Sequence, residues 1–256
     1  YKGQPATDYN RNQDELAITM IARWYDYWRE RPGTGNRVSS GGTKIIFSDT
    51  NTHYRGAENY EEWSDGRDAY RKDAFYAHQV MWDGGRYGKD QTYIIGHWNY
   101  PDNTVKPVQV VSTGEEVELF LNGNSLGKGK RQYNFLFTFD NDFKPGKLEA
   151  VSYNKAGKEI SRYAVNTAGE PASLKLTAIQ NPEGFHADGA DMTLIQVEVV
   201  DKDGQRCPLD NRTIQFTLKG QAEWRGGIAQ GKNNHILDTN LPVECGVNRA
   251  LIRSTT

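Results

Sequence analysis

Short apolar segments separated by turn signals follow one another from residue 91 onward, and no other feature constrains the fold as strongly. Turn signals such as Asn122-Gly123, Pro145-Gly146 and Asp203-Gly204 lie between them, without an intervening helical pattern. Closely spaced strands without helices are typical of an antiparallel β-sandwich of the immunoglobulin type. The strands are predicted at residues 92–98, 107–112, 117–121, 135–139, 148–153 and 160–165, and then at 174–177, 194–200, 214–218 and 249–252.

The linker Thr-Ala-Gly-Glu-Pro at residues 167–171 divides these strands into two sets. We therefore expect one immunoglobulin-like β-sandwich over residues 91–168 and a second over residues 169–256. A sandwich of this type needs about seven strands, and the second set offers fewer. Because the polar residues 253–256 directly follow an apolar run, the second sandwich is predicted to be truncated at its last strand.

The first 90 residues follow a different pattern. Residues 12–31 are predicted to form a long helix, with capping-box spacing at its start and Pro-Gly after its end. Residues 44–48 form an apolar run without alternation, which indicates a strand buried on both faces, as in a parallel sheet. A second helix is predicted at residues 73–82. One strand between two helices cannot close a parallel sheet, so residues 1–90 are interpreted as part of a larger α/β layer.

Aromatic residues give the first helix a distinct stripe. Leu16, Met20 (or Ile21), Trp24 and Trp28 recur every three to four positions, which places them on one face. We expect this face to pack against the rest of that α/β layer rather than to form an exposed aromatic platform.

Charge and cysteine content exclude several classes of protein. The chain has 31 Lys plus Arg against 33 Asp plus Glu, which argues against a nucleic-acid partner. No apolar run approaches the length of about 18 residues that spans a membrane. Two cysteines, Cys207 and Cys245, exclude a disulfide scaffold, although they could either pair or remain free thiols. The five histidines show no metal-ligand spacing, so neither a metal nor another cofactor is predicted.

Several long strings resemble the C-terminal part of glycoside hydrolase family 2, in particular β-galactosidase-like enzymes of gut and rumen bacteria. The resemblance implies a mainly β fold: two immunoglobulin-like β-sandwich modules preceded by an α/β remnant of a (β/α)₈ barrel in residues 1–90. It also points to a periplasmic or extracellular bacterial parent. The strings that carry it are residues 24–35, 46–60, 75–84, 94–101, 117–123 and 187–191.

The resemblance further implies a retaining mechanism in which two carboxylates lie about 5–5.5 Å apart. In this family both glutamates follow barrel strands 4 and 7, and residues 44–48 match strand 8. The catalytic pair is therefore expected upstream of Tyr1, and no catalytic residue is predicted within this chain. A self-contained pair of Asp49 and Glu58 is disfavoured because both would come from one loop without a rigid opposing element.

The loop after strand 8 is expected to line the sugar pocket of the intact parent, because barrel active sites are built from loops at that face. Carboxylates and amides suit sugar hydroxyl groups, and an indole suits the apolar face of a hexose. In the alternative interpretation the same polar residues cap turns and the tryptophan is part of a core. The candidate substrate-binding residues are Asp49, Asn51, His53, Arg55, Glu58 and Trp82.

Two kinds of partner follow from these expectations. One is an oligosaccharide or polysaccharide. The other is the remainder of the parent barrel, or a second copy of the chain, covering the helices at 12–31 and 73–82. The alternative to a glycoside hydrolase part is a module without catalysis, either a carbohydrate-binding module or a structural spacer.

Overall fold

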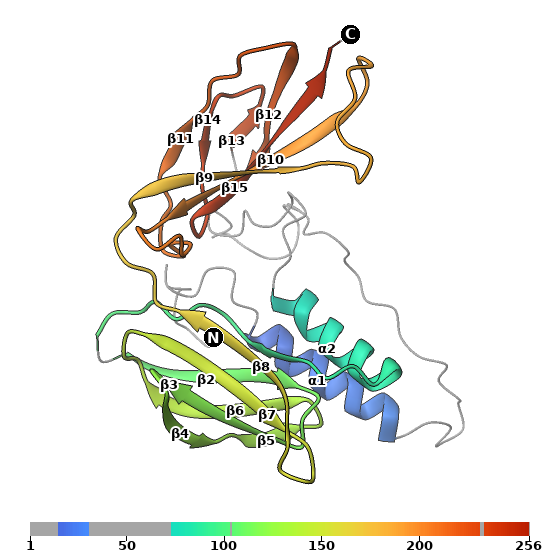
Figure 1. Ribbon diagram of the computed structural model, residues 1–256, viewed down its shortest axis with the longest axis vertical. Coiled ribbons are helices and arrows are strands. Elements are labelled where there is room, and N and C mark those ends of the chain that lie inside the picture. Colours follow the sequence, from blue (N-terminus) through green and yellow to red (C-terminus); the bar gives the residue numbers. More distant parts are fainter. Residues whose placement is uncertain (1–14, 31–72, 103, 231–232, 256) are drawn as a thin grey trace. The chain divides into compact units, whose positions relative to one another are not determined.

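The computed structural model describes residues 15–30, 73–102, 104–230 and 233–255 (Figure 1). The chain divides into two compact units, whose described residues are 15–30 with 73–167, and 168–255. Both units consist mainly of antiparallel strands, which confirms the mainly β fold with two sandwich modules. The strand predicted at residues 44–48 lies outside the described residues. Whether the helices are a barrel remnant, and whether the domain limits are as predicted, stay predictions.

The described residues of the first unit form two helices and eight strands. The predicted strands occur at the expected places with shifted ends, while the segment 124–133 forms two further strands that the sequence analysis did not predict. The elements are α1 (Glu15–Glu30), α2 (Asp73–Tyr87), β1 (Thr92–Ile94), β2 (Val105–Ser112), β3 (Glu116–Leu121), β4 (Asn124–Lys128), β5 (Lys130–Tyr133), β6 (Leu136–Asp142), β7 (Lys147–Tyr153) and β8 (Glu159–Asn166).

Two four-stranded antiparallel sheets, ordered β1-β2-β6-β5 and β4-β3-β7-β8, form the first sandwich. Their registers place Val110 opposite Phe137 and Leu119 opposite Ala150. All four side chains lie in the buried core between the sheets. Trp98 lies in the same core, where its indole N–H donates a hydrogen bond to the carbonyl oxygen of Lys144 at 2.9 Å. This hydrogen bond links the segment between β1 and β2 to the residues just before β7.

The opposite face of the β1-β2-β6-β5 sheet carries the two helices, which lie side by side against the first sandwich in Figure 1. Val111 and Leu136, a cross-strand pair on that face, are fully buried. Small residues, Ala22 of α1 and Ala77 of α2, let the helices approach the sheet closely. The sheet is therefore buried on both faces. This second core consists of Ile18, Ala22, Ala77, Val80, Met81, Ile95, Val111, Phe135 and Leu136.

The buried face of α1 differs from the predicted stripe. Ile18 and Ala22 are buried and Tyr25 packs beside them, at the spacing of successive helical turns. Met20 and Trp24 are exposed, with 53% of Trp24 accessible. The predicted stripe is expected to pack against the rest of the α/β layer, which lies outside the described residues, so that contact stays a prediction.

The second unit pairs a five-stranded sheet, ordered β13-β12-β15-β10-β9, with the two-stranded sheet β11-β14. Its core lies between them and includes Val197, Val199, Ile214 and Val243. The strands are β9 (Ser173–Ile179), β10 (Met192–Val200), β11 (Thr213–Gln215), β12 (Ala222–Gln230), β13 (Asn233–Ile236), β14 (Asn240–Pro242) and β15 (Val247–Ser254).

The second unit contains the predicted turn at residues 201–204 and both cysteines, so its structure tests the expectations for each. The predicted turn at residues 201–204 is confirmed: the Asp201 amide donates to the Gln205 carbonyl at 2.9 Å, and Gly204 has a φ of +77° that favours glycine. Cys207 and Cys245 are both buried, and no disulfide joins them. Among the described residues, no helix is long and apolar enough to cross a membrane.

We predict that Met81→Ala lowers the free energy of unfolding of the first unit by about 2–5 kcal/mol, because the substitution leaves a cavity between helix and sheet. Chemical denaturation followed by circular dichroism measures the change. Gln79→Ala, at an exposed position of the same helix, is the matched control and is expected to change stability by less than about 0.5 kcal/mol. Equal effects of the two substitutions would contradict the helix–sheet core.

Candidate functional site

Five of the six predicted sugar-binding residues, Asp49, Asn51, His53, Arg55 and Glu58, lie outside the described residues. The sixth, Trp82, lies on α2. The geometry of the predicted site can therefore be examined at Trp82 and along the helix that carries it.

Trp82 projects from α2 with 58% of its surface exposed, so it does not belong to the core between helix and sheet. The ring of His78, one turn earlier, lies 4.9 Å from the indole between ring centroids, at an interplanar angle of 60°. His78 Nδ1 lies 2.6 Å from the Ala74 carbonyl oxygen, to which a protonated Nδ1 donates. This bond holds the imidazole in place. The result is an exposed aromatic surface with a polar edge, which suits contact with the C–H face of a sugar.

The start of α2 is held by a buried contact that the sequence analysis missed. The Tyr93 hydroxyl of β1 donates a hydrogen bond to Asp73 Oδ1 at 3.0 Å, and Asp73 is only 6% exposed. Tyr76 stacks on Tyr93 at 4.5 Å between ring centroids, and the Tyr163 ring lies 4.7 Å from that of Tyr93 at an interplanar angle of 42°. Burial, and after it the negative charge of Asp73, raise the pKa of Tyr93 far above its usual value. Tyr93 therefore stays a protonated donor, and Asp73 also suits the positive end of the helix dipole.

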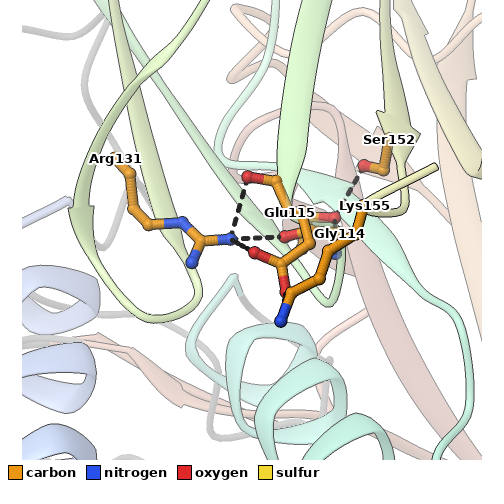
Figure 2. A network of polar contacts seen from close by, with 6 residues as sticks. Gly114, Glu115, Arg131, Ser152 and Lys155 are labelled. Carbon is orange, nitrogen blue, oxygen red and sulfur yellow. Dashed lines mark hydrogen bonds and ion pairs between the residues drawn. The ribbon is translucent and has the colours of Figure 1, made fainter. Parts of the chain in front are cut away.

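A second polar network surrounds the turn between β2 and β3 (Figure 2). Arg131 Nη2 donates to the carbonyl oxygens of Gly114 and Glu115 at 2.8 and 2.9 Å, and it lies 3.5 Å from the Glu115 carboxylate. Lys155 lies 3.9 Å from the same carboxylate. The Arg131 guanidinium also lies over the ring of Phe137 at 5.1 Å. Two backbone carbonyl oxygens and one carboxylate hold the Arg131 guanidinium, so this side chain fixes the turn between β2 and β3.

Three buried hydroxyl groups lie behind this turn. The Ser112 and Ser152 oxygens are 2.6 Å apart, as are those of Thr92 and Ser152. The Gly114 amide donates to the Ser112 oxygen at 3.0 Å. A Cβ at Gly114 would lie 2.9 Å from the Ser152 Cβ, so a glycine is needed for this close approach. The hydroxyl groups satisfy one another, which makes the cluster structural.

The acidic string at residues 187–191 is a capped turn in the second unit. Asp188 Oδ1 accepts hydrogen bonds from the amides of Ala190 and Asp191 at 2.8 and 2.7 Å, and from the Ser254 hydroxyl at 3.1 Å. The two amide bonds hold the pKa of Asp188 below its usual value. Across the described part of the chain, no group of three or more His, Cys, Asp or Glu side chains is arranged to hold a metal ion.

Family models match both sandwich modules. Residues 174–256 match the glycoside hydrolase family 2 C-terminal domain 5, and residues 103–161 match a domain of unknown function, DUF4982.

Curated relatives extend the similarity beyond the modules. A β-glucuronidase of Formosa agariphila is 38% identical over 250 residues, which are 96% of this chain and 24% of that protein. The β-galactosidase BoGH2A of Bacteroides ovatus is 31% identical over 153 residues, which are 59% of this chain and 17% of that protein. The chain thus spans about a quarter or less of the length of these relatives.

Solved structures of family 2 glycoside hydrolases are also similar to this chain, which again covers only part of each. A β-glucuronidase from glycoside hydrolase family 2 superposes with a TM-score of 0.67 and 41% identity, covering 72% of this chain and 19% of that one. A family 2 member from Bacteroides cellulosilyticus gives a TM-score of 0.66 at 27% identity, covering 74% of this chain and 28% of that one. The sequence comparison and the structure comparison therefore both find β-glucuronidases among the similar proteins.

We predict that Tyr93→Phe lowers the free energy of unfolding by about 1.5–3 kcal/mol, because it removes a hydrogen bond to a buried carboxylate. Urea denaturation of both proteins measures the difference. Tyr153→Phe removes a similar hydrogen bond, to Glu118, and serves as the matched control. Since that site is more solvent-accessible, its loss should be under about 1 kcal/mol.

The raised pKa of Tyr93 also predicts how the stabilising effect of its hydroxyl group depends on pH. The folded protein keeps the Tyr93 proton that the unfolded chain releases near pH ~10, so the contribution of Tyr93 is complete below that pH and is lost as the pH rises above it. The stability difference between the parent sequence and Tyr93→Phe should therefore shrink above pH ~10. A difference that grows with alkalinity would contradict the raised pKa.

Proposed function

The chain resembles the C-terminal part of the family 2 glycoside hydrolases, and on that premise we propose that it works as part of a retaining glycosidase acting on β-linked sugars. The observation that carries the proposal is the combination of a family 2 domain match with 38% identity across 96% of the chain. In this proposal the two catalytic glutamates belong to polypeptide upstream of Tyr1, and the chain supplies none.

The part of the chain before the sandwich contributes sugar-binding side chains in this proposal. A retaining mechanism needs the sugar held while one carboxylate attacks and the other transfers a proton. Asp49, Asn51, Arg55 and Glu58 have the polar groups to bind hydroxyl or carboxylate groups, together with His53. Trp82 offers an apolar stacking surface, which its exposure on α2 supports.

The outer sides of the helices support the proposed connection to a larger barrel. Met20, Trp24 and Tyr27 of α1 and Phe75 of α2 have large exposed apolar surfaces. Surfaces of this kind, gathered on two neighbouring helices, mark a contact region. We propose that the remainder of the barrel covers them, and a second copy of the chain is the competing occupant.

The substrate class follows from the relatives, which are named β-glucuronidase and β-galactosidase. Both names denote action on β-linked hexose derivatives, and the two sugars differ in configuration at C4 and at C6, where a glucuronide carries a carboxylate. Arg55 would suit that carboxylate, since guanidinium groups bind carboxylates bidentately. Comparing the two nitrophenyl glycosides on the intact enzyme decides between them.

We predict that the purified chain 1–256 hydrolyses neither nitrophenyl β-galactoside nor nitrophenyl β-glucuronide above the buffer blank, because both catalytic acids lie elsewhere. Colour release measures this directly. Turnover that co-elutes with the chain and disappears in Glu58→Gln and Asp49→Asn would contradict the proposal. Turnover that survives both substitutions would identify a contaminating enzyme.

In the intact enzyme we predict that Trp82→Ala raises KM roughly tenfold with little change in kcat, as expected when an aromatic contact worth about 1.4 kcal/mol is lost. Trp82→Phe should restore part of the affinity because a ring remains. Gln79→Ala, exposed on the same helix, is the control and should leave KM unchanged. An unchanged KM in Trp82→Ala would remove Trp82 from the binding surface.

A further inference from the structure

One edge of the five-stranded sheet in the second unit differs from the other sheet edges of the chain. β9 is the last strand in the order β13-β12-β15-β10-β9, so no described strand pairs with its outer edge. All seven residues from Ser173 to Ile179 are exposed. An unpaired edge presents a row of backbone N–H and C=O groups that can pair with another strand, and proteins usually protect such edges.

The other described edge strands carry such protection. β1, β11 and β14 are only three residues long. β4, β5, β8 and β13 each pair with their neighbour through a shift of register, the irregularity that a β-bulge produces. β9 instead keeps one register with β10 over all seven of its residues, and it contains no proline. Among the described strands, β9 is therefore the edge best suited to accept a further strand.

The side chains of β9 are mostly apolar. Leu174, Leu176 and Ile179 are 49%, 63% and 39% exposed. Lys175 is the single charged residue of the strand, and its ammonium lies 3.5 Å from the carboxylate of Glu198, its directly paired residue on β10. This ion pair draws the charge toward β10 and away from the free edge. The edge therefore lacks the projecting charge that commonly blocks an added strand.

We propose that β9 pairs with β9 of a second copy of the chain, antiparallel and about a two-fold axis at Leu176, so that one sheet continues through both copies. Directly opposite residues of an antiparallel pair share a face and contact each other. In this register Leu176 lies opposite Leu176 of the second copy, and Leu174 lies opposite Ala178. Apolar side chains therefore meet apolar side chains on that face of the joined sheet.

The charge pattern of β9 favours this register and this occupant. Rotation about Leu176 places Lys175 opposite Thr177 of the second copy, so the two lysines do not meet. An axis at Lys175 would place the two like charges directly opposite each other, which is destabilising. An axis at Thr177 would place Lys175 opposite the apolar Ile179. The strand is thus complementary to itself in one register, as a two-fold symmetric interface requires.

Crosslinking at adjacent positions of β9 tests the proposal. Leu176→Cys places a thiol beside its own counterpart at the axis, where opposite Cβ atoms lie about 4.5–5.5 Å apart, close to disulfide geometry. Thr177→Cys, the matched control on the same strand, faces Lys175 of the second copy instead. Under mild oxidation, Leu176→Cys should form a covalent dimer at least about tenfold faster than Thr177→Cys on non-reducing gels. The chain without added cysteines gives the background, since Cys207 and Cys245 are buried.

Light scattering over a concentration series gives a second measurement that needs no added cysteine. The chain should show a concentration-dependent dimer, and Leu176→Lys, which places two like charges at the axis, should abolish it. Leu126→Lys, at an exposed leucine of the edge strand β4, is the matched control and should leave the dimer unchanged. Circular dichroism establishes that both variants fold.

A monomer at every concentration would overturn the proposal. A dimer that survives Leu176→Lys would also overturn it, as would equal crosslinking of the two cysteine variants. The dimer contact would then lie elsewhere, with the exposed helix faces of the first unit as the next surface to test. None of these readouts needs catalytic turnover or the rest of the parent enzyme, so failure here is separate from failure of the proposed function.

Discussion

Burial of both faces of one sheet holds the first unit together. Neighbouring residues of β2 alternate between its two cores: Val110 points into the sandwich and Val111 points toward the helices, and neither has accessible surface. The paired residues Phe137 and Leu136 on β6 divide in the same way. A change of register by one residue would exchange the two sets, so burial on both faces fixes the pairing of β2 with β6. The helices are therefore part of the same compact unit as the first sandwich.

This arrangement shows where sequence patterns are informative and where they are not. The strands could be predicted because alternation and turn residues are local signals, as at the Asp201–Gly204 turn. The face of α1 that packs on this sheet could not be predicted, because the large aromatic residues at helical spacing mark a different face. The sheet instead selects Ala22 and Ile18, and this choice depends on the surface opposite the helix, which the helix sequence does not encode. The short exposed strands β4 and β5 also lack an apolar pattern that would reveal them.

At the candidate site, too, one feature could be predicted from the sequence and another could not. Trp82 could be proposed from its residue type and its place after the predicted barrel strand; the structure gives its exposure on α2, and its binding role stays a prediction. The Tyr93–Asp73 contact could not be found, because a tyrosine and an aspartate twenty residues apart form no motif until the fold brings them together. That contact joins the first turn of α2 to β1 of the sandwich. The sandwich therefore helps to position the helix that carries Trp82. In the proposed enzyme, the sandwich would thus act as a support for one side of the sugar pocket.

Native-state hydrogen exchange tests most directly whether helices and sandwich are one cooperative unit. If the doubly buried sheet unites them, the slowest amides of α1 and α2 should exchange with the same opening free energy as those of β2 and β6, and all should fall together as denaturant is added. Helix amides that open at much lower free energy, while the β2 and β6 amides stay protected, would contradict this cooperativity. The helices would then be only attached to a sandwich that is stable without them.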